Sequence, residues 1–297
     1  MDLLMKEFLD YLIYEKNYSI KTKDSYGKDI FEFTKYLNAE NITDLLKVRE
    51  EDFRGYQIFL SVKKNSNSTI SRKISSIRSM YNYFLKRNYI KLNPIAGIVS
   101  PKKEKKLPKF ISLEEVEKLL DKIDTSTFIG ERDYLIIELF YSTGIRISEL
   151  TNILIEDISM SERSIRINSG KGNKDRTVFY GKRLEIILKK YLSSGRVNLA
   201  NNNNYLVVSN RGNKINEGVV RKILDDLIKE ASLTMHISPH SLRHTFATHL
   251  MNNGADIVTV KELLGHESLG STEIYTHVTS ERLKSVYNMA HPRAKKK

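Results

Sequence analysis

The chain has 297 residues, a length that suits two domains, and 49 Lys and Arg against 36 Asp and Glu give it a net charge of +13. It contains no cysteine, which excludes disulfides, thiol catalysis and Cys-based zinc sites and makes a cytoplasmic location the default expectation. No apolar run approaches the roughly 20 residues of a membrane span, and the amphipathic N-terminus is unlike a signal peptide, so no membrane association is expected.

Residues 1–96 have the periodicity of helices throughout. In the first forty residues, apolar side chains recur at helical spacing: Leu4, Phe8, Tyr11, Leu12, Ile30, Phe33, Tyr36 and Leu37. After a turn at residues 67–69, a second apolar stripe predicts a helix that ends before Asn93-Pro94. That stripe consists of Ile70, Ile74, Ile77, Met80, Tyr81, Phe84 and Leu85. Such a helix can bury one face and present its polar face to a DNA groove.

The charge of this region is strongly one-sided. From Phe53 to Lys103 there is no Asp or Glu, while Lys and Arg occur throughout. This pattern predicts a phosphate polymer as the partner, and the alternative is a solvated Lys-rich surface. The candidate DNA-binding residues are Lys63, Lys64, Arg72, Lys73 and Arg78, together with Lys102, Lys103, Lys105 and Lys106.

Residues 97–109 combine two prolines and five lysines without periodicity, which predicts an extended basic linker. Its cations can follow a phosphate backbone. Ser112 and Glu115 then fit a capping box at the start of a helix. We therefore expect a helical domain at 1–96, a linker at 97–109 and a second domain at 110–297.

The second domain has mixed patterns. Residues 132–143 predict an apolar helix that Gly144 stops, and residues 164–167 and 176–179 alternate like two strands. A Gly-rich turn at 168–175 joins these strands into a hairpin, on which Lys171 lies. Residues 198–204 read as a polar loop, and everything from residue 216 onward reads as helices.

All seven histidines lie in the last quarter of the chain, and two of them flank an arginine on one predicted helix. Pro239 suits the first turn of that helix. On a helical wheel His240, Arg243 and His244 cluster beside the apolar face, at the rim of the core, where they can point at an anion. One alternative is that neighbouring acids satisfy them. Another is a metal site, for which the chain lacks an HExxH arrangement and any Cys.

Three further segments place polar side chains beside predicted helix ends. Arg146 follows Gly144, His266 follows the helix-ending Gly265, and Tyr275 lies in the first turns of the next helix. Taken singly, a turn Arg is more often a surface residue and a Tyr is more often in the core. Together they form an ordered set.

As a set, these segments resemble the tyrosine site-specific recombinases, the phage integrase family. That family's catalytic pattern is Arg, Lys, His-x-x-Arg, His or Trp, then Tyr, and this chain matches it at every position. The matching residues are Arg146, Lys171, His240, Arg243, His266 and Tyr275, within the segments TGIRISEL, GKGNKDR, HSLRHTFATHL, LLGH and IYTH. The two-domain layout covers essentially the whole chain, and within the family it most resembles the Xer recombinases, including the ending HPRA at 291–294.

The resemblance implies a mainly α fold. We expect an N-terminal helical bundle, a SAM-like core-binding domain, and an α+β catalytic domain with a small antiparallel β-sheet, together forming a C-shaped clamp on DNA. It also implies strand exchange through a Holliday junction, in a homo- or heterotetramer on two double-stranded DNA recombination sites. For Xer recombinases this would resolve chromosome dimers at cell division, with a DNA translocase at the division site as a further candidate partner. The tail that follows Tyr275 would pack into the neighbouring protomer.

Phosphodiester chemistry gives these residue types physical roles. Two Arg forks match the non-bridging oxygens of a phosphate and stabilise its pentacoordinate state, so we expect no metal and no other cofactor. Glu149, one helical turn after Arg146, either orients that Arg or caps a helix. A Tyr phenol, with a pKa of about 10, needs a base or a positive pocket before it can attack. His240 is the candidate base, His266 a phosphate donor, and Lys171 resembles the family's general acid.

Other functions remain open at this level. A mobile-element integrase would use the same six residues, and a type IB topoisomerase would share the chemistry without exchanging strands. A non-catalytic DNA-binding factor would not require Tyr275. A His-metal hydrolase would lose its activity in a chelator.

Overall fold

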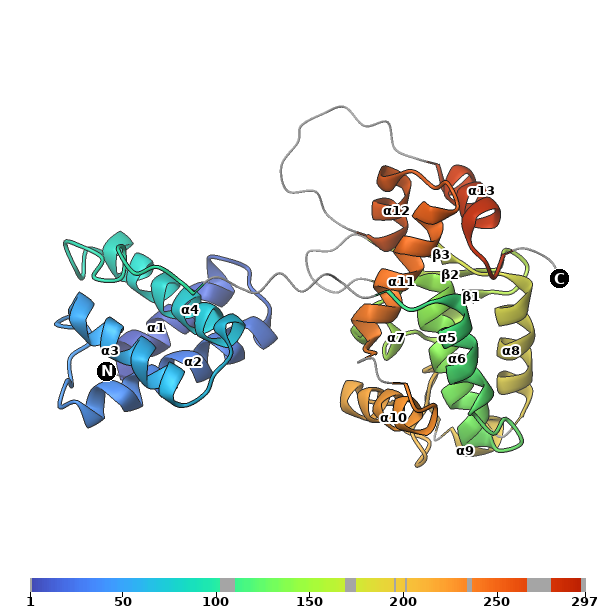
Figure 1. The fold of residues 1–297 in the computed structure, drawn as a ribbon, viewed down its shortest axis with the longest axis horizontal. Helices are drawn as coiled ribbons and strands as arrows, with labels where there is room; N and C mark the ends of the chain where they lie inside the picture. Colours follow the sequence, from blue (N-terminus) through green and yellow to red (C-terminus); the bar gives the residue numbers. More distant parts are fainter. Residues whose placement is uncertain are drawn as a thin grey trace. The chain divides into compact units, whose positions relative to one another are not determined.

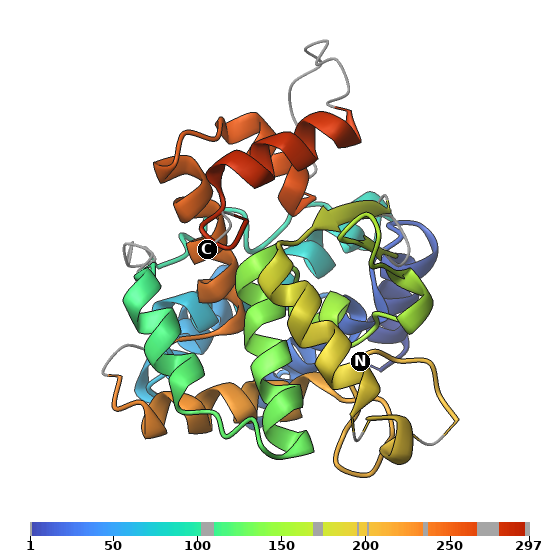
Figure 2. The ribbon, with the colours of Figure 1, turned by 90° about the vertical axis from the view of Figure 1, so that its right-hand side faces the viewer.

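We describe the protein from a computed structural model, which covers residues 2–101, 110–168, 175–194, 196–200, 202–233, 237–265 and 279–294. The chain forms two compact units, Met1–Leu107 and Pro108–Lys297 (Figures 1 and 2). In the part of the chain that is described, no helix is long and apolar enough to cross a membrane.

The first unit is helical, as its periodicity predicts. It consists of α1 (Asp2–Tyr14), α2 (Ile20–Ala39), α3 (Glu50–Val62) and α4 (Asn67–Lys86) (Figure 1). The hydroxyls of Ser19 and Ser66 accept hydrogen bonds from backbone N–H groups in the first turns of α2 and α4, and so cap these helices. Phe33, at the centre of the core, stacks on Phe53. The predicted apolar stripe of α4 is buried, except that Leu85 is exposed.

The segment that follows this unit is more ordered than a linker. Ile98 is buried in the core of the first unit, and its carbonyl accepts a 2.5 Å hydrogen bond from Arg78 Nη2. Ser71 Oγ donates to the carbonyl of Pro101 at 3.0 Å. The predicted linker, 97–109, therefore begins with residues that contact the first unit: Ile98 is buried in its core, and the carbonyls of Val99 and Pro101 accept hydrogen bonds from α3 and α4. Residues 102–109, with the rest of the predicted linker, lie outside the described residues.

The second unit combines helices with a small sheet. Its elements are α5 (Leu113–Asp121), α6 (Phe128–Thr143), α7 (Ile147–Leu150), the 3-10 helix η1 (Ile155–Asp157), β1 (Ile158–Ser159), β2 (Ser164–Ile167), β3 (Arg176–Phe179), α8 (Lys182–Ser193), α9 (Arg196–Leu199), α10 (Glu217–Glu230), α11 (Pro239–Asn252), α12 (Ile257–Leu264) and α13 (Ser280–Ala290). Helix α6 is buried on nearly all sides and lies between α8 and α11 (Figures 1 and 2).

The sheet has the order β1-β2-β3 and is antiparallel throughout. Strands β2 and β3 have the predicted bounds, and Ile167 pairs with Arg176 where the hairpin leaves the sheet. The two-residue strand β1 was not predicted, because two residues are too few to show an alternating pattern. Helices α12 and α13 both contact β3, so the sheet links the hairpin to the C-terminal helices.

The C-terminal segment folds back onto the second unit. Residues 291–294 lie beside α6, and His291 is fully buried, with its ring stacked on Tyr287 at a centroid distance of 5.0 Å. Burial lowers the pKa of His291 to about 3, so the ring is neutral at physiological pH. Arg293 forms ion pairs with Glu117 and with the buried Glu138. Residues 291–294 thus pack against α6 of their own chain, and packing of the tail into a neighbouring protomer stays a prediction.

Candidate active site

Two helices of the second unit end at glycines whose C-terminal carbonyls face the same group of arginines. Gly144 ends α6 with φ 61° and Gly265 ends α12 with φ 63°, both in the left-handed region, as the sequence predicts. A Cβ at Gly144 would lie 2.5 Å from a ring carbon of Phe246, so no side chain fits there. The last carbonyls of a helix lack intrahelical partners and carry partial negative charge, which attracts cations.

Arg243, on α11, bridges these two helix ends. Its Nη1 donates to the carbonyl of Gly144 at 2.6 Å and its Nη2 to the carbonyl of Leu264 at 2.5 Å. The residue is 4% exposed, so it lies deeper than the rim position that the helical wheel predicts. Burial, followed by the positive charge of Arg146, lowers the pKa of Arg243 to about 10, which leaves the side chain charged at neutral pH.

Arg146 contacts the same C-terminal end of α12. Its Nη2 donates to the carbonyl of Gly265 at 3.2 Å, and its Nη1 donates to Glu149 Oε1 at 2.8 Å. The backbone N–H of Arg146 donates to the other Glu149 oxygen at 2.7 Å, in a capping box for α7. Glu149 therefore fills both of the roles that the sequence left open. The Arg146 side chain is 35% exposed, so its guanidinium remains accessible to a ligand.

Sequence reasoning missed a third arginine of this group. Arg176, at the start of β3, donates from Nη1 and Nη2 to the two oxygens of Glu149, each at 2.8 Å. Burial raises the pKa of Glu149, but the hydrogen bonds and charges of Arg176 and Arg146 outweigh it and hold that pKa at about 2. Arg176 is the last residue of the GKGNKDR segment, so the sequence did offer it as a candidate. We interpreted it only as the first residue of a strand.

Three positive charges and one carboxylate leave this group with a surplus of positive charge. Forked N–H donors of this kind match the oxygens of a phosphate, and their value rises where water is excluded. The arrangement can therefore hold an anion and stabilise negative charge that develops on it.

Of the other predicted site residues, the structure describes only the histidines of α11. His240 is exposed in the first turn of α11, three residues before Arg243, and His244 is half-buried on the same helix. Lys171, His266 and Tyr275 lie outside the described residues. Arg146 and Arg243 are thus brought to one helix end, while the positions of the nucleophile and the general acid stay predictions. Among the residues described, no group of three His, Asp or Glu is arranged to hold a metal ion.

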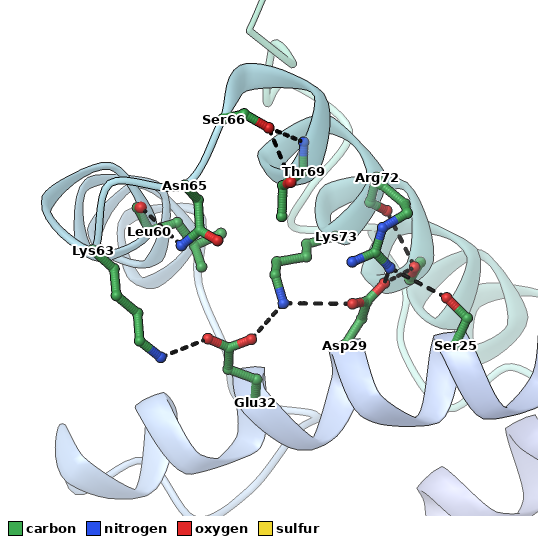
Figure 3. Close-up of polar contacts among 11 residues, drawn as sticks. Ser25, Asp29, Glu32, Leu60, Lys63, Asn65, Ser66, Thr69, Arg72 and Lys73 are labelled. Carbon is green, nitrogen blue, oxygen red and sulfur yellow. Dashed lines mark hydrogen bonds and ion pairs between the residues drawn. The ribbon is translucent and has the colours of Figure 1, made fainter. Parts of the chain in front are cut away.

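Three of the predicted DNA-binding cations of the first unit pair with carboxylates of α2 (Figure 3). Lys63 Nζ lies 2.9 Å from a Glu32 oxygen, and Lys73 and Arg72 pair with Glu32 and Asp29 respectively. Lys73 also lies 3.5 Å from Asp29 and is 7% exposed. Lys73 is therefore an internal ion-pairing residue of the α2–α4 interface, and its prediction as a DNA contact is wrong in this structure. Arg72 and Lys63 keep exposed side chains.

Of the other predicted DNA-binding cations, the structure describes Lys64 and Arg78. Arg78 donates to the Ile98 carbonyl, which directs it toward its own unit, and Lys64 is exposed with a left-handed φ of 58°. Lys102, Lys103, Lys105 and Lys106 lie outside the described residues. Lys64, Lys63 and Arg72 thus remain the candidates that this structure leaves accessible.

Replacing Asp29 by Asn should destabilise the first unit by about 2–4 kcal/mol, because it removes the charge that faces the buried Lys73. Asp29 is 2% exposed and also accepts hydrogen bonds from Arg72 and Ser76. Chemical denaturation followed by circular dichroism measures the change. Asp24→Asn, an exposed site on the same helix, is the control and should shift stability by less than about 0.5 kcal/mol. Equal effects of the two variants would contradict the structural role of Asp29.

The chain is similar to known proteins over both of its units. The phage integrase family matches residues 109–282, and the family's N-terminal SAM-like domain matches residues 5–88. Proteins named tyrosine recombinase XerC are similar over nearly the full chain. That of Anoxybacillus flavithermus is 44% identical and covers 97% of each chain. That of Oceanobacillus iheyensis is 40% identical and covers 99% of this chain and 97% of its own. A solved structure of the XerH site-specific recombinase bound to a palindromic difH substrate has a TM-score of 0.71 at 24% identity. It covers 97% of this chain and 82% of that one, which shows a shared fold.

Proposed function

The chain belongs to the phage integrase family, and on that premise we propose that it is a site-specific tyrosine recombinase of the Xer type. It cuts and rejoins DNA strands through a covalent protein–DNA intermediate. The observation that carries the proposal is the convergence of Arg146 and Arg243 on the C-terminal end of α12, with Glu149 bonded to the first of them. Two guanidinium groups at one helix end can bind the non-bridging oxygens of a phosphodiester.

In the proposed cleavage step, Tyr275 attacks the scissile phosphorus in line with the departing 5′-oxygen. The forks of Arg146 and Arg243 hold the non-bridging oxygens, on which negative charge increases in the pentacoordinate state. His240 accepts the phenol proton, and His266 donates a further hydrogen bond to the phosphate. The bond between phosphorus and the 5′-oxygen breaks as the bond to the Tyr275 oxygen forms, and Lys171 donates the proton that the departing 5′-oxygen takes up. The products are a 3′-phosphotyrosyl link and a free 5′-hydroxyl.

Rejoining is the reverse reaction, with a 5′-hydroxyl as the nucleophile. The phosphotyrosyl ester conserves the energy of the broken phosphodiester, so the cycle needs no ATP. The positive charge that a metal ion would otherwise supply comes from the two arginines, so the cycle needs no metal. When the attacking hydroxyl belongs to a partner strand, the result is strand exchange through a Holliday junction.

The proposed biological setting is the resolution of chromosome dimers before cell division. The similarity to proteins named tyrosine recombinase XerC over nearly the full chain supports this assignment. We infer a cytoplasmic tetramer on two recombination sites, built from copies of this chain or from this chain and a related recombinase. A DNA translocase at the division site is a further candidate partner. A mobile-element integrase is the alternative setting for the same chemistry.

Covalent trapping on a nicked suicide substrate tests the proposal directly. The cleaved strand loses a short 5′-hydroxyl fragment by diffusion, so the protein stays attached to DNA and migrates as a slower band. Full adduct formation in EDTA is expected, whereas loss of the adduct in EDTA would favour a metal-dependent hydrolase. Binding without any adduct would favour a non-catalytic DNA-binding protein, and supercoil relaxation without strand exchange would favour a topoisomerase.

Replacing Lys171 by Ala should slow cleavage of ordinary DNA by about 10²–10⁴-fold, because the 5′-oxygen then leaves without a proton donor. DNA with a 5′-bridging sulfur should restore the rate to within about tenfold of the unsubstituted protein, since a thiolate leaves without protonation. Single-turnover adduct formation on the two substrates measures both rates. Equal impairment on oxygen and sulfur substrates would contradict the general-acid role.

A further inference from the structure

Arg176 makes several hydrogen bonds of defined geometry, which is unusual for a residue at the end of a short hairpin. Its two terminal nitrogens bond the two oxygens of Glu149 in parallel at 2.8 Å each, and its Nε donates to the carbonyl of Leu263 at 3.2 Å. The Arg176 side chain is 11% exposed and that of Glu149 8% exposed. A Cβ at Gly265 would lie 2.8 Å from Arg176 Cδ, so the helix end is shaped around this arginine.

The contacts of Arg176 end on the residue that holds Arg146. Glu149 receives the Arg176 fork, the Arg146 side chain at 2.8 Å and the Arg146 backbone N–H at 2.7 Å. With one oxygen shared by both guanidinium groups, rotation of the Glu149 carboxylate would break bonds to both. A bidentate Arg–carboxylate pair defines orientation more sharply than a single bond does. Arg176 thus determines the direction from which Glu149 meets Arg146.

The contacts of Arg176 also connect separate elements. Arg176 is the first residue of β3, directly after the hairpin segment that carries Lys171 in sequence. Its bond to Leu263 joins this point to the last turn of α12, whose next two carbonyls accept from Arg243 and Arg146. One side chain therefore joins the start of β3, helix α7 and the end of α12.

We propose that Arg176 is a positioning residue for strand cleavage, which acts through Glu149 to aim Arg146 at the scissile phosphate. The inference rests on the proposed function. The terminal fork of Arg176 is occupied by the Glu149 carboxylate and its Nε by the Leu263 carbonyl, whereas the fork of Arg243 bonds only neutral carbonyls. The role of Arg176 is therefore to hold Arg146 rather than to touch DNA. The same reasoning makes Glu149 the intermediary, since its carboxylate accepts hydrogen bonds from the side chains of both arginines.

The test combines Arg176→Gln and Arg176→Lys with single-turnover adduct formation and with DNA affinity. For Arg176→Gln we expect a loss of cleavage rate of about 10²-fold, with DNA affinity within about threefold, because Arg146 is misdirected rather than removed. Arg176→Lys keeps the charge but cannot form two parallel bonds, so it should recover only part of the rate. Arg166→Lys, on the neighbouring strand β2, is the matched control with an exposed side chain and should stay within about twofold.

The pH dependence separates this role from general support of the fold. Glu149 faces Arg146 at the N-cap of α7 and Arg176 on β3, and Arg243 on α11 lies within range of its charge. Without Arg176, burial raises the pKa of Glu149 with less opposition, so its proton occupancy increases as the pH falls. The rate ratio of Arg176→Gln to the unsubstituted protein should therefore decrease from pH 7.5 to pH 5.5, while the ratio for Arg176→Lys should change less.

A double-mutant cycle with Glu149→Gln identifies the route. If Arg176 acts through Glu149, the combined variant should lose little more rate than the more impaired single variant. Additive losses, a rate for Arg176→Gln within threefold of the unsubstituted protein, or a rate loss with a flat pH ratio would each overturn the proposal. Adduct formation by the unsubstituted protein with an unaffected Arg176→Gln variant contradicts this inference alone. No adduct from the unsubstituted protein contradicts the proposed function as well.

Discussion

Replacing Tyr275 by Phe is expected to abolish the covalent adduct, with at least a roughly 10³-fold loss, while DNA affinity stays within about twofold. Phe keeps the ring and removes only the hydroxyl that would attack phosphorus. An isolated phenol has a pKa of about 10 and is a weak nucleophile at neutral pH, so its attack depends on a base and on nearby positive charge. Arg146 and Arg243 supply such charge at the end of α12.

Because the chain contains sixteen tyrosines, the effect of Tyr275→Phe must be compared with the same substitution at another tyrosine. Tyr14 on α1 is 79% exposed, and Tyr14→Phe should form adduct at the rate of the unsubstituted protein. Proteolysis and mass spectrometry of the trapped complex identify the modified side chain. Adduct that persists in Tyr275→Phe, or a nucleotide mapped to another residue, would assign the nucleophile elsewhere.

Replacing Arg243 by Lys is expected to reduce the cleavage rate by about 10²–10³-fold at pH 7, although the substitution keeps a positive charge. The two terminal nitrogens of Arg243 donate to the carbonyls of Gly144 and Leu264, at 2.6 and 2.5 Å respectively. A Lys ammonium is a point charge that cannot span both carbonyls and still offer a planar edge to phosphate. DNA affinity, which depends on many contacts, should change less than the cleavage rate.

The pH profile of this variant should differ in a defined direction. Burial and the charges of Arg146 and Arg176 lower the pKa of Arg243 to about 10, and the same causes would lower the pKa of a Lys at that position. A Lys begins from a lower pKa than an Arg, so it loses its proton as the pH rises through a range where Arg243 stays charged. The rate ratio of Arg243→Lys to the unsubstituted protein should therefore fall between pH 7 and pH 9.

Arg221→Lys provides the matched control on α10, because its side chain is 53% exposed and pairs with Glu217 one turn away. It should stay within about twofold of the unsubstituted protein at every pH. A rate for Arg243→Lys within tenfold at pH 7, or a ratio that rises with pH, would argue against the phosphate-binding fork. A thermal unfolding measurement at each pH distinguishes loss of the fold from loss of chemistry.

Local patterns predicted the elements well where the signal is contained in a short stretch. The bounds of β2 and β3 follow from alternation, and the ends of α6 and α12 follow from glycines that adopt positive φ. The capping box at Ser112 is also present as predicted. These features depend on interactions between residues a few positions apart, so they can be read before the fold is known.

Burial was harder to predict where a charged residue is satisfied from a distance. Lys73 was predicted as a DNA contact, but it is buried beside Asp29, which is 44 positions away on another helix. Arg243 was expected at the rim, yet carbonyls 99 and 21 positions away allow it to be buried. The tail residue Arg293 is held by Glu117, 176 positions earlier. Such ion pairs and hydrogen bonds compensate the desolvation of a charge, and no local pattern shows whether they exist.

For this protein, the sequence by itself determined the family, the division into a helical domain and a mixed domain, and the candidate residues. These depend on which residue types occur and in what order. Only the tertiary structure decided how Arg146, Arg176 and Arg243 share the carbonyls at the end of α12 and the carboxylate of Glu149. The physical reason is the distance along the sequence between the residues that interact. A helix or a hairpin is stabilised by neighbours in sequence, whereas the hydrogen bonds that join these three arginines to α12 and Arg176 to Glu149 span 21 to 119 positions.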